Sequence, residues 1–196
     1  SSGMMDEFLA EQKNMLRREM LARRRAFSAE ERRRASQIIC ARAMTVPALQ
    51  NARTIMLYAP TAEEIAEVGI YHLSIAPDGI ISFGQGCEGE PSLAADRIAE
   101  GIRKIRAVTA RGQINMNSNA GFPEGMKKIV DAGLDSLRVS IISARDESYD
   151  AYYRASYPLA SVKESLRYAL DHGVYVSLNL LHFPGFTDRA EELAAW

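Results

Sequence analysis

The sequence predicts an α/β fold in which a helical hairpin precedes about five βα units. Short apolar runs rich in strand-forming residues alternate with longer stretches of helical periodicity from residue 54 onward. No low-complexity linker interrupts this alternation. Helices of this length between strands are typical of right-handed βαβ units, which build parallel sheets. We expect a sheet curved like part of a TIM barrel, and a flatter, doubly wound sheet is the alternative.

The first 60 residues predict two helices and a strand. Residues 6–25 place Leu9, Leu16 and Met20 on one helical face. Ser28 and Glu31 have the spacing of a capping box, which predicts a second helix running to about residue 44. The apolar residues 54–58 then predict a strand that ends before Pro60.

The rest of the chain predicts four more strands and their helices. The strands are expected at residues 79–83, 113–117, 136–142 and 174–181, and the helices at 62–75, 92–108, 123–132, 160–171 and from 189 to 196. Gly133 and Gly173 follow two of these helices and suit their C-terminal ends. We divide the chain into residues 4–61 and 62–196, packed as one α/β domain.

Composition excludes several classes of protein. The longest uncharged run, residues 174–187, is too short to span a bilayer and contains a proline. The N-terminus lacks the apolar core of a signal peptide, and two cysteines cannot form a disulfide framework, so we expect a cytoplasmic protein without a membrane partner. The first 53 residues hold 11 basic and 6 acidic side chains. These basic runs lack interleaved aromatic residues, and we therefore expect no nucleic-acid partner.

A glycine-rich loop at residues 84–91 follows one apolar strand. Its glycines at positions 84, 86 and 89 let the backbone approach a ligand closely. Polar side chains also stand where successive strands should end: Glu88, Glu90, Asn117, Ser118, Asn119, Ser140, Ser143, Asn179 and His182. Because the carboxyl ends of parallel strands meet at one edge, we predict a single polar cleft. Helix caps or Asx turns would account for each group taken alone.

The cysteines, one histidine and a group of tyrosines carry predictions of their own. Cys87, inside the loop, is expected to be a small filler rather than a nucleophile, and Cys40 to lie in a core. His182 could serve as an acid–base group. The tyrosines at positions 149, 152, 153 and 157 could wall a pocket, although packing over the sheet is the commoner use.

Four segments carry a resemblance to a known family. They are Gly86-Cys87-Glu88-Gly89-Glu90-Pro91, residues 113–119, residues 137–154 and residues 176–185. In order and spacing they resemble the middle of the partial (βα)6 barrel of radical S-adenosylmethionine enzymes, over about residues 66–196. This resemblance implies that the loop, with Gly86, Glu88, Gly89 and Glu90, meets the methionine part of S-adenosylmethionine. It implies that Asn117, Ser140 and Asn179 lie at adenosyl-contacting positions.

The sequence departs from that family at its cysteine motif. A C-x-x-x-C-x-x-C loop after the first strand should supply three thiolates to a [4Fe–4S] cluster. This chain has only Cys40 and Cys87, which are 47 residues apart. We therefore expect no [4Fe–4S] cluster and no metal site.

Residues 4–61 resemble a second family. The segments are Gln12-Lys13 with Leu16-Arg17, Arg23 to Arg32, and Ala52 to Pro60. They resemble the N-terminus of 5-formyltetrahydrofolate cyclo-ligase. This resemblance implies that Lys13 and Arg17 bind ATP phosphates, and that Glu64 is the nearest match to a folate-contacting glutamate. The glycine-rich nucleotide loop of that family is absent from this sequence.

The two resemblances together predict a hybrid joined near residues 61–65. We expect a chimeric α/β protein without evolved catalysis, which binds S-adenosylmethionine or ATP weakly at most. The alternatives are an ATP-dependent cyclo-ligase and a functional radical S-adenosylmethionine protein. Residues 174–181 are uncharged and rich in strand formers, so we also expect association of copies through an exposed strand edge.

Overall fold

The computed structural model describes residues 2–57, 61–84 and 89–196. The chain divides into two compact units, Ser1–Arg42 and Ala43–Trp196. Unit 1 contains α1 (Ser2–Ala26) and most of α2 (Ala29–Ala43), as the sequence predicts. The predicted capping box starts α2, because the Ser28 amide donates to Glu31 Oε2 at 2.8 Å and the Glu31 amide donates to Ser28 Oγ at 3.1 Å. These hydrogen bonds from Ser28 hold the pKa of Glu31 below its ordinary value.

Unit 2 contains the sheet and its helices. The first elements are α3 (Pro47–Gln50), β1 (Thr54–Leu57), α4 (Ala62–Ile75), β2 (Ile80–Phe83), the 3₁₀ helix η1 (Pro91–Ala94) and α5 (Ala95–Val108). The remaining elements are β3 (Gln113–Asn117), α6 (Pro123–Gly133), β4 (Ser136–Ile141), α7 (Asp146–Tyr153), α8 (Leu159–Asp171), β5 (Tyr175–Leu180) and α9 (Ala190–Leu193). All five predicted strands are present. The sequence did not predict α3 or α7, and the last helix is shorter than expected.

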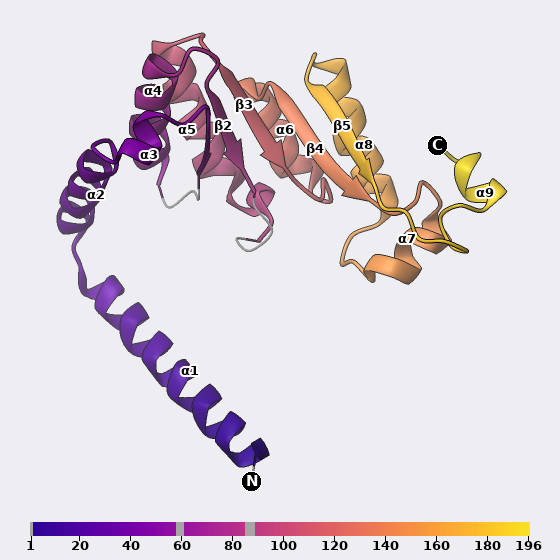
Figure 1. Cartoon of the computed structure of the whole chain (residues 1–196), viewed down its shortest axis with the longest axis horizontal. Coiled ribbons are helices and arrows are strands. Elements are labelled where there is room, and N and C mark those ends of the chain that lie inside the picture. Colours follow the sequence, from indigo (N-terminus) through magenta and orange to yellow (C-terminus); the bar gives the residue numbers. More distant parts are fainter. Residues whose placement is uncertain (1, 58–60, 85–88) are drawn as a thin grey trace. The chain divides into compact units, whose positions relative to one another are not determined.

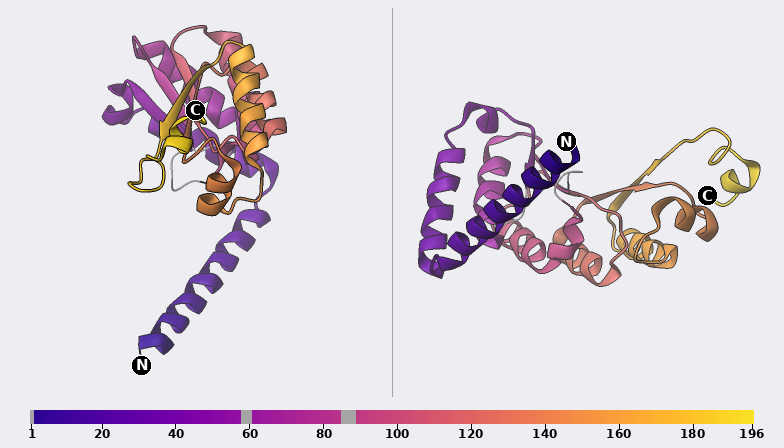
Figure 2. Two further views of the ribbon diagram at one scale, coloured as in Figure 1. Left: turned by 90° about the vertical axis from the view of Figure 1, so that its right-hand side faces the viewer. Right: turned by 90° about the horizontal axis from the view of Figure 1, so that it is seen from below.

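The sheet has five parallel strands in the order β1-β2-β3-β4-β5. Each strand therefore pairs with its neighbour in sequence, and the order never reverses as it does in a doubly wound sheet. Successive right-handed crossovers then place the helices that connect the strands on one face. Figures 1 and 2 show α4, α5, α6 and α8 side by side on that face. The predicted α/β fold with a five-stranded parallel sheet is confirmed, and the strand order favours the partial barrel over the doubly wound alternative.

The core lies between the sheet and this layer of helices. Ile55, Ile81 and Ile114 stand side by side on β1, β2 and β3, and all three are buried. The next buried row holds Phe83, Met116 and Leu137, paired in the same way. Apolar burial of this kind contributes most of the stability of such a domain. Among the helices of the described residues, none is long and apolar enough to cross a membrane.

The opposite face of the sheet is polar. Ser82, Asn115 and Ser136 form one row across β2, β3 and β4. The Asn115 amide donates to Ser82 Oγ at 3.0 Å, and Ser136 Oγ donates to Asn115 Oδ1 at 2.7 Å. Alternating side chains thus give β3 and β4 one apolar and one polar face, which leaves a hydrophilic surface leading to the carboxyl ends of these strands.

At the opposite end of the strands, Arg106 joins α5 to the turn before β3. Its guanidinium donates to the carbonyls of Arg111 at 2.8 Å and Gly112 at 3.2 Å, and pairs with Asp135 Oδ2 at 2.6 Å. The same carboxylate oxygen accepts the Ile114 amide at 2.8 Å. This end of the sheet is therefore held by charged side chains with a structural role.

Candidate functional site

A polar cavity lies at the carboxyl ends of β2 to β5 and has a volume of about 550 Å³. Loops after β2 and β3 form one side, and β4, β5 and α7 form the other. Its lining residues are Gly84, Gly89, Glu90, Pro91, Asn117, Ser118, Asn119, Arg138, Ser140, Tyr152, Tyr153, Asn179 and Leu181. In parallel α/β folds this edge of the sheet is where ligands bind.

Glu90 holds the loops of β2 and β3 together. Its Oε1 accepts the Ser92 amide at 3.1 Å, the Ser92 hydroxyl at 2.7 Å and the Ser118 hydroxyl at 2.5 Å. Its Oε2 accepts the Asn119 amide at 2.8 Å. The carboxylate therefore caps the start of η1 and fixes the next loop. A ligand would meet mainly the backbone of this segment, since protein donors occupy the Glu90 carboxylate.

Gly84 lets the loop after β2 pass close to β3. Its φ is +82°, and a Cβ atom at this position would lie 2.1 Å from the Asn117 carbonyl oxygen. Any side chain here would clash with backbone, so the residue must be glycine. The close approach brings Gly84 and Asn117 to the same wall of the cavity.

The floor of the cavity carries short polar side chains from neighbouring strands. Asn117 pairs in register with Arg138, and Ser140 pairs with Asn179. The Asn179 amide is 3.4 Å from Ser140 Oγ, and Asn117 Oδ1 accepts the Asn115 amide at 3.2 Å. Amide and hydroxyl groups of this kind hydrogen-bond sugar hydroxyls and base edges. Arg138 adds a positive charge beside them.

Aromatic side chains close the side of the cavity formed by α7. Tyr152 and Tyr153 contact each other edge to face, with ring centroids 4.8 Å apart. Tyr152 also contacts Phe183, which follows β5, at 5.6 Å. The Tyr153 hydroxyl donates to the Ser140 carbonyl at 3.2 Å. Burial raises the pKa of Tyr153 to about 12, so its phenol stays neutral near pH 7.

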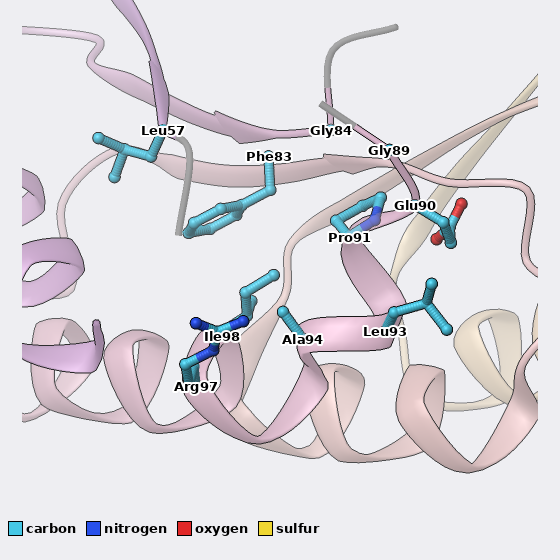
Figure 3. Close-up of a pocket in the computed structure, with 10 residues that line it drawn as sticks. All are labelled: Leu57, Phe83, Gly84, Gly89, Glu90, Pro91, Leu93, Ala94, Arg97 and Ile98. Atoms are coloured by element: carbon cyan, nitrogen blue, oxygen red, sulfur yellow. The ribbon is translucent and has the colours of Figure 1, made fainter. Parts of the chain in front are cut away.

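A smaller and more apolar pocket of about 260 Å³ adjoins this cavity at the ends of β1 and β2. Gly84, Gly89, Glu90 and Pro91 line both. Figure 3 shows Phe83 pointing from β2 toward Ala94 and Ile98, with Arg97 on the next part of the same wall. The two hollows together follow the edge of the sheet from β1 to β5.

Comparison with known families identifies this architecture. The family description "Radical SAM superfamily" matches residues 39–196, which is most of the chain. The chain belongs to the Radical SAM superfamily. No curated protein matches it. The family match begins before β1, whereas the motifs of the sequence suggested a start near residue 66. The resemblance of residues 4–61 to a cyclo-ligase stays a prediction.

The structure brings together five of the nine residues that the sequence suggested for ligand binding. Gly89, Glu90, Asn117, Ser140 and Asn179 all line the polar cavity of this radical SAM barrel. Gly86, Glu88 and Cys87 lie outside the described residues. Lys13 and Arg17 lie on α1, in the other unit, and are exposed.

Two of the suggested strand-end residues do not join the cavity. Ser143 is buried, and its hydroxyl donates to Glu192 Oε2 at 2.5 Å instead of facing the cleft. His182 is not part of the cavity lining. Arg138 also lines the cavity and was not among the predicted site residues, although it lies two residues before Ser140 on the same strand and so shares its face.

Radical SAM chemistry calls for a cluster held by three thiolates, and the residues present do not fit that requirement. The sequence contains two cysteines, and neither lies between β1 and α4, where the cysteine loop of the family is expected. Among the described residues, no group of three His, Cys, Asp or Glu side chains could hold a metal ion. The polar cavity, in contrast, carries hydroxyl, amide and backbone groups that can hydrogen-bond a small polar ligand.

Proposed function

We propose that this member of the Radical SAM superfamily binds a small adenosyl-type ligand in the polar cavity and does not perform reductive cleavage. The observation that carries the proposal is the convergence of Asn117, Ser140 and Asn179 on one cavity with the Gly89–Glu90 backbone. Short side chains that donate and accept hydrogen bonds suit ribose hydroxyls and a purine edge. With two cysteines in the sequence, the three-thiolate cluster has no ligand set.

Affinity should be weak for a physical reason. In a complete radical SAM site the cluster iron chelates the methionine end of S-adenosylmethionine. This chain lacks the three cysteines that would hold such a cluster, so that chelation is missing. Each 1.4 kcal/mol lost is about a tenfold loss of affinity. We therefore expect dissociation constants roughly in the high micromolar to millimolar range for S-adenosylhomocysteine.

The proposal is tested by calorimetry or ligand-observed NMR with S-adenosylhomocysteine. Asn179→Ala and Ser140→Ala should each weaken binding several-fold. Gln113→Ala serves as the matched control, because Gln113 is exposed at the opposite end of β3 and its substitution should leave binding unchanged. A folded wild-type protein that shows no binding in both assays would refute the adenosyl site. Nanomolar binding abolished by Asn179→Ala would refute the view that binding is residual.

The origin of residues 4–61 is a separate proposal. We propose that they derive from a cyclo-ligase-like protein, and the basis is the motifs around Lys13 and Arg17. Lysine as a point charge and arginine as a planar fork both suit phosphate. ATP titration of the wild type and of Lys13→Ala/Arg17→Ala tests this, and equal heats for the two proteins would contradict it.

A further inference from the structure

Helix α1 presents an apolar face that nothing in unit 1 covers. Eight large apolar side chains along it are each at least half exposed: Met4, Met5, Phe8, Leu9, Met15, Leu16, Met20 and Leu21. Seven of the eight, all but Leu21, fall on one side of the helix, because their spacings repeat at three, four and seven residues. Glu19 and Arg23 interrupt this side and pair with each other at 2.6 Å.

An isolated helix with such a face requires a partner. Most of the stability of a helix in a protein comes from packing of its apolar face, and isolated helices are marginal in water. α1 has 25 residues and is therefore about 38 Å long at 1.5 Å per residue. The C-terminal half also borders an apolar hollow of about 750 Å³, lined by Leu16, Met20, Leu21 and Phe27 among others.

The two halves of α1 carry opposite net charges, and this distribution indicates which kind of partner the helix can bind. The half up to Gln12 carries three acidic and no basic side chains: Asp6, Glu7 and Glu11. The half from Lys13 carries six basic side chains and one acidic one: Lys13, Arg17, Arg18, Arg23, Arg24, Arg25 and Glu19. The net charges are −3 and +5. An anionic lipid surface would repel the first half, and a parallel second copy would place like charges side by side.

An antiparallel second copy satisfies both halves at once. Each acidic half then lies along the basic half of the other helix, while the apolar faces pack between them. The contact is isologous, so a two-fold axis near the middle of α1 repeats each favourable pair. Opposite charges beside an apolar seam set partner orientation in helical dimers.

We propose that α1 is a dimerisation helix, which pairs with α1 of a second copy of this chain in antiparallel orientation. The two helices should cross at about 20° with axes about 8–10 Å apart. A stable interface buries at least about 1,200 Å² in total, and seven large apolar side chains on one side of α1 are available for this in each copy. The cavity in unit 2 plays no part in the proposal.

The test uses paired charge reversals in the full chain, with mass measured by sedimentation or light scattering. An N-variant carries Asp6→Lys and Glu7→Lys, and a C-variant carries Arg24→Glu and Arg25→Glu. Each variant alone should lose the dimer, with its dissociation constant raised at least tenfold, because like charges now meet at both ends. A one-to-one mixture should restore a heterodimer, because the reversed ends attract each other again.

The control variant is Arg32→Glu with Arg34→Glu, which makes an equal charge change on α2 and should leave the dimer intact. Circular dichroism confirms that the helices of all variants persist. A monomeric wild type would overturn the proposal, as would two single variants that both stay dimeric. Failure of the mixture to restore the dimer would overturn the antiparallel pairing. Binding of α1 to vesicles of anionic phospholipid in place of dimerisation would also overturn it.

Discussion

Replacing Glu90 with alanine should destabilise unit 2 even though Glu90 lies in the loop of the proposed binding site. The carboxylate accepts four hydrogen bonds from Ser92, Ser118 and Asn119. Ser92 and Ser118 are buried, so water cannot fully replace the lost acceptor. The substitution removes a helix cap and leaves buried donors without a partner, two effects with well-defined magnitudes.

The expected loss is about 2–4 kcal/mol in the free energy of unfolding. A hydrogen bond to a charged group contributes about 1.5–3 kcal/mol, and four bonds to one carboxylate are not additive. Loss of the N-cap of η1 accounts for about 1 kcal/mol of this. In a domain of this size the change corresponds to a fall in melting temperature of roughly 5–15 °C.

Urea denaturation and thermal melts followed by circular dichroism measure the effect. Glu90→Gln keeps one acceptor and should lose about half as much as alanine, because its amide nitrogen cannot accept the Asn119 N–H. Glu67→Ala is the matched control, since Glu67 is exposed on α4 and its loss should change stability by less than about 0.5 kcal/mol. If Glu90→Ala were as stable as this control, the carboxylate would not be the link between the two loops.

Four further outcomes follow from other parts of the molecule. Hydrogen bonds from Ser143 and Ser148 hold the pKa of Glu192 below its ordinary value of 4.5. The stabilisation by this carboxylate is therefore complete above pH 4.5 and is lost as the pH falls through the lowered pKa. In Glu192→Gln the melting temperature should fall less steeply as the pH is lowered through the acid range. Arg106→Ala should lower the free energy of unfolding, measured by urea denaturation, by roughly 1–3 kcal/mol. Replacing an exposed arginine of the same helix with alanine should have a much smaller effect. Tyr175→Lys should reduce any association through the β5 edge seen by light scattering, and an unchanged mass would argue against that edge. Anaerobic reconstitution of the protein with iron and sulfide should yield far less than one [4Fe–4S] cluster per chain, and about four irons per chain would contradict this.

The sheet could be predicted from the sequence because its strands are apolar runs between clear helix and turn signals. β2, β3 and β4 begin and end within one or two residues of the predicted ranges. The helix α3 was missed, although Pro47 stands at its start and proline is well suited to the first turn of a helix. The helix α7 was missed because its aromatic and acidic residues carry no clear apolar stripe.

The site was predictable only in part. The prediction used the residues at the strand ends and left out the alternation of polar and apolar side chains along each strand. Residues 113–117 and 136–141 alternate polar and apolar side chains, and this pattern places Asn115 and Arg138 on the open face with Asn117 and Ser140. Ser143 was misassigned for another reason. Its partner, Glu192, lies 49 residues further along the chain, and no local pattern predicts such a contact.

The residues that stabilise this radical SAM fold lie apart from the place where the family carries its cysteine motif, so the fold does not need that motif. The buried apolar rows face the helices, whereas the expected cysteine loop would stand at the carboxyl ends of the strands. Cysteines in such a loop would therefore add little to the packing of the core. Glu90 is the exception, because it lies in the loop of the proposed site and yet its carboxylate stabilises the fold. Its presence is explained by the four protein donors that it accepts, and so it is weaker evidence for a bound cofactor than Asn179 or Ser140, whose side chains border the cavity directly.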